Sequence, residues 1–170
     1  MPERFRRFFL KEKESKGVLG EASKRFKVDL QQIFKDKPRV EAVETGFAEI
    51  FLINGRPIMA RTEGTVYPTL IFKEFFDRAP KVVVDMGAVP YVCKGANIMA
   101  PGIRRFEGEF SKGDFVCVID EKHGKPLAIG EALYSVEEAK NVKQGIVLKN
   151  AHFVGDRTWD LMKQLITPAR

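Results

Sequence analysis

Apolar and charged residues alternate along the first forty positions in a pattern that predicts one strand and two helices. The aromatic segment 4–10 is predicted to be a short strand, with four side chains available for burial: Phe5, Phe8, Phe9 and Leu10. A helix is predicted over residues 14–26 with Ser15 as its cap, because apolar residues recur at helical spacing: Val18, Leu19, Ala22 and Phe26. A second helix is predicted over residues 29–34.

A β region follows these helices. Residues 40–43 and 48–53 are predicted strands, and Asn54-Gly55 separates the second of them from the apolar residues 58–60. An Asn-Gly pair between strand-like segments is a strong hairpin signal, because both turn residues must adopt positive φ. Gly64 interrupts this pattern, and a helix is predicted over residues 71–76.

After Ala79-Pro80, which is the best candidate for a domain boundary, the chain changes to short strands with frequent glycines. Strands are predicted at 81–84, 97–100, 115–119, 127–133 and 145–148. Short helices are predicted at 88–94 and after Ser135, where Glu138 completes a capping box. The pattern predicts an α+β protein: a small N-terminal α/β unit, a mostly closed barrel of short mixed strands, and a final helix over residues 159–166.

Charge is unevenly distributed over this pattern. The net charge is +6, and residues 1–39 hold twelve Lys and Arg against six Asp and Glu, while the rest of the chain holds seventeen of each sign. A basic segment on a neutral body indicates a polyanionic partner, although solvated helix faces explain the same count equally well. If this segment contacts RNA, replacing Lys24, Arg25 and Lys27 with Ala together should weaken binding and flatten its salt dependence.

Residues suited to catalysis or metal binding are sparse. The histidines, His123 and His152, form no metal-ligand spacing with the cysteines, Cys93 and Cys117, and the common nucleophile, zinc and phosphate-loop motifs are missing. We therefore expect a protein that is not an enzyme, with no catalytic residue, metal or cofactor. Both cysteines lie in apolar stretches, which favours buried thiols over a disulfide. The lack of a signal peptide, or of an apolar run of about 20 residues, predicts a soluble, cytoplasmic protein without a membrane partner.

Two glycine-bracketed segments carry a family resemblance. Residues 83–89 (Val-Val-Asp-Met-Gly-Ala-Val) and 94–103 (Lys-Gly-Ala-Asn-Ile-Met-Ala-Pro-Gly-Ile) resemble the opening of PUA domains, which bind RNA, and matching segments continue in order at 108–116, 128–130 and 147–153. With the Asn54-Gly55 hairpin, Tyr67-Pro68-Thr69-Leu70 and Asp156-x-x-Trp159, the chain is similar to the malignant T-cell-amplified sequence (translation machinery-associated) family, as a stand-alone member of archaeal type. The resemblance implies a pre-PUA α/β domain over residues 1–79, a PUA pseudo-barrel over 80–155, and a C-terminal helix over 156–170 that packs on the body.

The resemblance also implies where RNA binds, along the first helix of the PUA domain, the next strand and the glycine-rich loops. Carried over by position, the RNA-binding residues are Gly87, Ala88, Lys94, Gly95, Ala96, Asn97, Met99, Pro101 and Gly102, extended by Arg104 and Arg105. Small residues let a phosphodiester approach backbone N–H groups, and Lys94 adds a counter-charge. Turn geometry alone explains each glycine equally well, and Asn97 either reads a base edge or holds its turn. Met86 departs from the family, whose members more often carry a charged residue there.

The function implied is non-catalytic binding of structured RNA, tRNA or ribosomal RNA, in translation initiation or ribosome recycling. The implied partners are this RNA, the small ribosomal subunit, and a density-regulated-like or other initiation-factor-like protein. The alternative is an RNA-targeting subunit of an RNA-modification enzyme.

A third interpretation is a protein-docking module that uses the hairpin or an apolar patch, comprising Ile71, Phe72, Phe75 and Phe76. If these phenylalanines are inter-domain core instead, Phe75→Ala should cost about 3–5 kcal/mol of stability.

Overall fold

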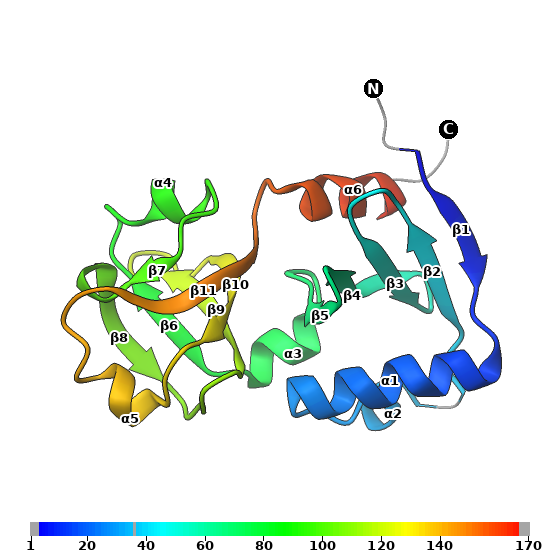
Figure 1. Ribbon diagram of the computed structural model, residues 1–170, viewed down its shortest axis with the longest axis horizontal. Coiled ribbons are helices and arrows are strands. Elements are labelled where there is room, and N and C mark those ends of the chain that lie inside the picture. Colours follow the sequence, from blue (N-terminus) through cyan, green and yellow to red (C-terminus); the bar gives the residue numbers. More distant parts are fainter. Residues whose placement is uncertain (1–3, 36, 167–170) are drawn as a thin grey trace.

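Two β-sheets lie side by side along the long axis of the molecule (Figure 1). The computed structural model describes residues 4–35 and 37–166. The N-terminal sheet is an antiparallel meander in the order β1-β2-β3-β4-β5, and the second sheet has the order β7-β11-β10-β9-β6-β8. The α+β class predicted from the pattern is confirmed, with the second sheet as the curled barrel of short mixed strands.

Two tight turns shape the N-terminal sheet. Its strands are β1 (Arg6–Phe9), β2 (Val40–Glu44), β3 (Glu49–Ile53), β4 (Arg56–Thr62) and β5 (Thr65–Pro68). Asn54 and Gly55 have φ angles of 52° and 82°, which confirms the predicted hairpin. Glu63 and Gly64 adopt the same two angles, so the glycine interpreted as a break is a second hairpin turn leading into β5.

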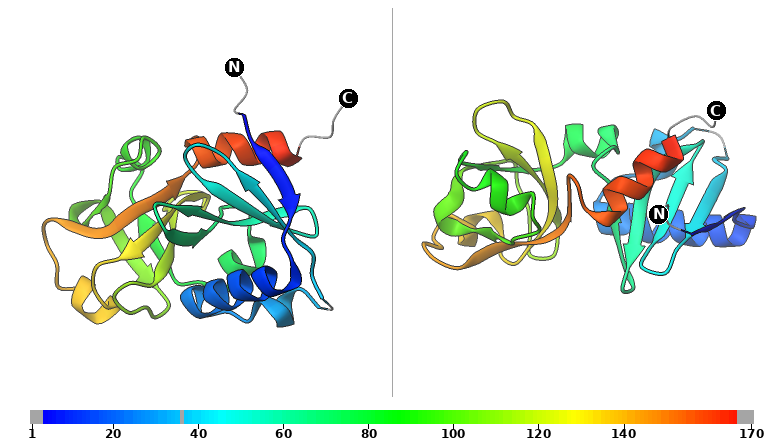
Figure 2. Two further views of the ribbon diagram at one scale, coloured as in Figure 1. Left: turned by 45° about the vertical axis from the view of Figure 1, so that its right-hand side comes forward. Right: turned by 90° about the horizontal axis from the view of Figure 1, so that it is seen from above.

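Helices cover both faces of this sheet (Figures 1 and 2). Helices α1 (Glu12–Phe26) and α2 (Leu30–Ile33) lie against one face, and α6 (Arg157–Ile166) lies against the other. The predicted cap at Ser15 is wrong, because α1 begins one turn earlier and Ser15, only 9% exposed, faces the core with Leu19. The Glu14 carboxylate instead accepts a hydrogen bond of 3.3 Å from the Lys11 N–H, where a negative charge favours a helix start.

Helix α3 (Lys73–Arg78) connects the two sheets. Phe72 is 0% exposed and Phe75 is 3% exposed, so both belong to the core and not to an exposed docking face. The Phe26 ring lies 5.8 Å from the Phe75 ring, and also 5.8 Å from the Phe115 ring of the second sheet, both edge to face. Phe72 and Phe75 therefore belong to a core cluster that also takes in Phe115 of the second sheet. The expected cost of about 3–5 kcal/mol for Phe75→Ala stands, to be measured by urea denaturation.

The second sheet is mixed, since β6 runs parallel to β9 and the other pairs are antiparallel. Its strands are β6 (Lys81–Val84), β7 (Ile98–Met99), β8 (Ile103–Glu107), β9 (Phe115–Asp120), β10 (Pro126–Ala132) and β11 (Ile146–Phe153). Its helices are the single turns α4 (Val89–Val92) and α5 (Val136–Ala139) and the 3-10 turn η1 (Ala100–Gly102). The Ser135 hydroxyl accepts from the Glu138 N–H at 3.2 Å, which confirms the predicted cap of α5. Strand β8 was not predicted, because its charged, half-exposed residues lack an alternating pattern.

Charged side chains join α1 to the second sheet. The Arg25 guanidinium lies 4.3 Å above the Phe115 ring and donates to the Gly113 carbonyl and the Glu131 carboxylate. The Lys27 ammonium lies 2.7 Å from the Asp114 carboxylate. These two basic residues therefore help to hold the two sheets together, and the RNA contact considered for the basic segment stays a prediction.

Candidate nucleic-acid interface

A concave surface of about 420 Å³, here called the α4 hollow, lies between the loop after β6, α4 and the η1 turn. Its lining brings together seven of the eleven RNA-binding residues expected from the resemblance: Gly87, Ala88, Ala96, Asn97, Met99, Pro101 and Gly102. The other lining residues are Val84, Asp85, Tyr91, Val92 and Ile98. Most of these side chains are apolar, so the hollow suits a ligand that presents a flat apolar face.

Two hydrogen bonds made by Asp85 fix the loops that form the hollow. The Asp85 N–H donates to the Gly102 carbonyl at 2.9 Å, which ties the end of β6 to η1. The Asp85 carboxylate accepts from the Ala88 N–H at 2.8 Å and fixes the loop before α4. A Cβ on Gly102 would lie 3.1 Å from the Ala88 Cβ, a tight contact, so the close approach of these two loops favours glycine there.

Gly95 and Asn97 both have structural reasons for their identity. Gly95 has φ of 96°, and a Cβ there would lie 3.0 Å from the Phe153 ring, so backbone conformation and packing both require glycine. The Asn97 side-chain oxygen accepts from the Asn150 N–H at 2.9 Å. Of the two roles expected for Asn97, holding the turn is therefore the one for which the structure supplies a contact.

The rim of the hollow carries exposed apolar side chains. Tyr91 is 68% exposed, and Met86, Met99 and Ile146 are also exposed. Met99 pairs with Ile146 across β7 and β11, while its neighbour Ile98 is buried. Alternation along the predicted strand required one of Ile98 and Met99 to be core, and the structure assigns that position to Ile98.

Sequence reasoning missed Tyr91, which contributes the largest exposed ring of this rim. The exposure was not evident from the sequence, because only the structure shows that Val92 is the buried residue of the single-turn helix α4 while its neighbour Tyr91 is exposed. An aromatic residue that projects outward beside a glycine-rich loop is a candidate contact for a base.

The basic residues beside the hollow lie in exposed positions. Arg104 contacts Glu121 at 3.0 Å and Arg105 contacts Glu107 at 2.9 Å, with all four side chains partly open to solvent. The Glu121 carboxylate also accepts from the Met86 N–H at 3.3 Å, which places Arg104 near the loop that edges the hollow. Exposed ion pairs contribute little stability, so both arginines can exchange a carboxylate for a phosphate. Lys94 is exposed directly after α4.

Asp120, Cys93 and Cys117 lie outside the lining of the hollow, and their pKa values are shifted by burial and by local hydrogen bonds. Three backbone N–H groups, with that of His123 making the largest contribution, lower the pKa of Asp120 and hold the β9–β10 turn. Burial raises the pKa of the Cys117 thiol to about 12 and also raises the pKa of Cys93. Over residues 4–35 and 37–166, His, Cys, Asp and Glu form no group of three or more that could hold a metal ion. Over the same ranges, the helices are too short or too polar to cross a membrane.

Two known families match the chain. Residues 80–154 match the PUA domain, and residues 6–73 match a family described as a domain of unknown function (DUF1947). An uncharacterised protein of Methanocaldococcus jannaschii is 36% identical over 157 residues, which are 91% of this chain and 96% of that protein. The malignant T-cell-amplified sequence 1 protein of Rattus norvegicus is 31% identical over 78% of this chain and 76% of its own length. Translation machinery-associated protein 20 of Saccharomyces cerevisiae is 27% identical over 77% of each chain.

Solved structures share this fold. A PUA domain structure from Aeropyrum pernix, in complex with tartrate, superposes with a TM-score of 0.81 and 26% identity over 95% of this chain and 93% of that one. A hypothetical protein from Pyrococcus horikoshii superposes with a TM-score of 0.76 and 32% identity over 92% of this chain and 99% of that one. The likeness extends over both sheets of the molecule.

Proposed function

Because the chain belongs to the family of PUA-domain proteins that includes the malignant T-cell-amplified sequence and translation machinery-associated proteins, we propose that it binds structured RNA in translation. The RNA is tRNA or ribosomal RNA, and the setting is the small ribosomal subunit during initiation or recycling. A density-regulated-like or other initiation-factor-like protein is the further partner. The name of the matched translation machinery-associated protein supports a role in translation.

The observation that carries the proposal is the α4 hollow with Tyr91 at its rim. Its volume of about 420 Å³ falls in the range of small-molecule sites, and its apolar lining suits the face of a single base. An unpaired base of an otherwise structured RNA can leave its stack and rest on the Tyr91 ring. This adds a place for one nucleotide to the phosphodiester contacts that the sequence led us to expect.

Phosphate contacts provide the rest of the interface. Lys94 stands at the end of α4, and Arg104 and Arg105 follow the η1 turn on β8. Both arginines now hold exposed carboxylates at about 3 Å, a weak arrangement that a phosphodiester can replace with release of counterions. Glycines in the adjacent loops leave backbone N–H groups accessible for close approach.

The test is a filter-binding titration of the full chain with bulk tRNA over a series of salt concentrations. We expect binding that weakens steeply with salt, and we expect Arg104→Ala with Arg105→Ala to reduce the slope by about two, since one phosphate contact is lost per arginine. Lys13→Ala with Lys16→Ala removes the same charge from α1 and should leave the slope nearly unchanged. A wild-type chain without affinity for tRNA at low salt refutes the proposal.

The cellular setting requires a second measurement. We expect a tagged chain to be recovered with small ribosomal subunits at low salt and to be released at high salt. Recovery with a methyltransferase or a pseudouridine synthase, and without ribosomal subunits, would support the alternative of an RNA-modification subunit.

A further inference from the structure

Strand β11 contains a β-bulge beside the α4 hollow. Ile129 of β10 pairs with His152 and the next residue, Gly130, pairs with Asn150, so Ala151 is an extra residue on β11. In a regular strand, residues two positions apart face the same side. The extra residue reverses this relation, so Asn150 and His152 face opposite sides of the sheet.

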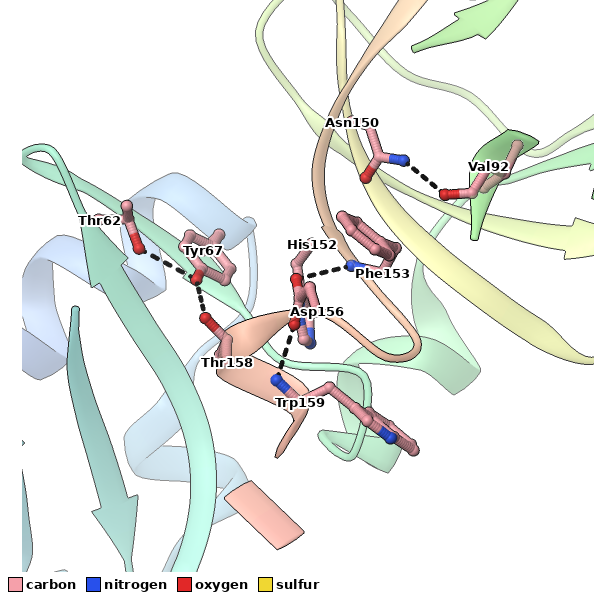
Figure 3. Close-up of polar contacts among 9 residues, drawn as sticks. All are labelled: Thr62, Tyr67, Val92, Asn150, His152, Phe153, Asp156, Thr158 and Trp159. Atoms are coloured by element: carbon pink, nitrogen blue, oxygen red, sulfur yellow. Dashed lines mark hydrogen bonds and ion pairs between the residues drawn. The ribbon is translucent and has the colours of Figure 1, made fainter. Parts of the chain in front are cut away.

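Asn150 faces the α4 hollow. Its amide nitrogen donates to the Val92 carbonyl at 3.1 Å (Figure 3). The same nitrogen donates to the Ala96 carbonyl at 3.0 Å, and the main-chain N–H donates to the Asn97 side-chain oxygen at 2.9 Å. These three hydrogen bonds hold the end of α4 and the loop that follows it. Residues Val92, Ala96 and Asn97 all line the hollow, so Asn150 sets the shape of its wall without being a lining residue.

The chemistry of this position requires an amide. Two carbonyl oxygens converge on one side-chain atom, and an NH₂ group offers the two donors that they need at this reach. Within the described part of the chain, the buried Oδ1 of Asn150 accepts no hydrogen bond, so the donors carry the contact. A carboxylate of the same size would place oxygen against oxygen at both carbonyls.

His152 faces the other way, toward the N-terminal sheet. It is fully buried, its Nδ1 lies 2.8 Å from the Asp156 carboxylate, and its ring lies 5.6 Å from the ring of Tyr67 in β5. The Asp156 carboxylate also accepts from the Trp159 N–H at 2.7 Å and so begins α6 (Figure 3). One strand therefore contacts the hollow on one side and the N-terminal sheet on the other.

From this geometry we propose that Asn150 is the positioning residue of the α4 hollow, held in place by the bulge at Ala151. The proposal rests on the proposed function in one respect, that the ligand in the hollow is RNA. Asn150 acts through the wall that it fixes, and His152, two residues away, anchors the same strand without contacting that wall.

The main test is Asn150→Asp, which keeps the size of the side chain and removes its donors. Bulk tRNA should bind at least about tenfold more weakly, the loss expected when buried carbonyls lose their partners. The loss should persist at every salt concentration tested, including those that screen the added negative charge, because no phosphate contact is removed. Affinity relative to wild type should recover as the pH falls, because protonation of the introduced carboxyl restores one donor.

Two further variants serve as controls. His152→Phe removes the contact with Asp156 on the opposite side of the bulge, and it should lower the melting temperature while tRNA affinity stays close to wild type. Asn150→Ser keeps one donor and should bind with intermediate affinity. If Asn150→Asp fails to fold, Asn97→Ala is the second variant, because it removes the side-chain oxygen that accepts from the Asn150 N–H. It should weaken binding and leave the salt slope unchanged.

Amide hydrogen exchange separates this proposal from the proposed function. In Asn150→Asp, the amides of residues 96–98 should exchange faster than in wild type, whether or not RNA binds. Wild-type exchange at these amides overturns the positioning role even if tRNA binds the chain. Faster exchange in a chain that never binds tRNA refutes the RNA function and leaves the positioning of the hollow intact.

Discussion

The Tyr91 ring is well placed to contact a ligand, because it is 68% exposed at the rim of the α4 hollow. We expect Tyr91→Ala to weaken tRNA binding by about 1–3 kcal/mol, the usual contribution of one stacked base. The melting temperature should hardly change, because an exposed side chain contributes little to stability. Tyr91→Phe keeps the ring and should bind like wild type. Equal affinity of Tyr91→Ala and wild type would exclude a stacked base at this position.

The two cysteines should differ in reactivity. Burial raises the pKa of Cys117 to about 12 and also raises the pKa of the half-buried Cys93, and only the thiolate reacts with alkylating reagents. At pH 8 we expect slow alkylation of Cys93 and protection of Cys117 until the chain unfolds. Labelling of Cys93 should accelerate as the pH rises toward 10, whereas Cys117 stays protonated. Peptide mapping by mass spectrometry distinguishes the sites, and rapid labelling of Cys117 in the native chain would contradict its burial.

At the scale of an element, the end of α1 is a bridge between the sheets. Arg25 and Lys27 contact Glu131 and Asp114, so Arg25→Ala with Lys27→Ala should lower stability by about 1–3 kcal/mol through lost charge-assisted hydrogen bonds. The salt slope of RNA binding should not change, which is the opposite of the outcome expected if this segment contacts RNA. Lys24→Ala removes an exposed positive charge from the same helical turn without removing a contact to Glu131 or Asp114, so it is the matched control and should leave stability unchanged in urea denaturation. A flattened slope in the double variant would restore the RNA role of this segment.

The strands missed by pattern reasoning share one cause. Strand β5 follows a turn whose first residue is Glu63, a side chain that rarely adopts φ of 52°. Strand β8 is an edge strand that carries Arg104 and Arg105. In both, pairing with a neighbouring strand forms the element, and that pairing is invisible in the local sequence. Asn54-Gly55 and Ser135 were predicted correctly because their hydrogen bonds and backbone angles are local.

At the scale of the whole molecule, α6 follows the second sheet in the sequence but packs on the N-terminal sheet. Leu161 and Met162 are buried in the cluster that contains the N-terminal sheet, and the same cluster takes in Phe115, Cys117 and Ile129 of the second sheet. The division into domains at 79/80 and 155/156 stays a prediction.

This shared core predicts how the molecule unfolds. Leu161→Ala should cost about 2–5 kcal/mol, and both sheets should unfold in one cooperative transition in urea. Trp159 fluorescence and far-ultraviolet circular dichroism should report the same midpoint, in wild type and in the variant alike. Two separated transitions would show that the shared core does not couple the unfolding of the two sheets.

The sequence by itself determined the class of the fold, the hairpin at Asn54-Gly55 and the segment that forms the α4 hollow. The fold class and the hairpin follow from apolar periodicity and turn chemistry, which act between residues a few positions apart, whereas the segment of the hollow was expected from the family resemblance of its residues. Only the tertiary structure decided that Arg25 holds a carboxylate 106 positions away, that Tyr91 stands at the rim, and that Asn150 faces the hollow while His152 faces the N-terminal sheet. Each of these depends on which distant surface a side chain meets, and a bulge of one residue is enough to reverse it.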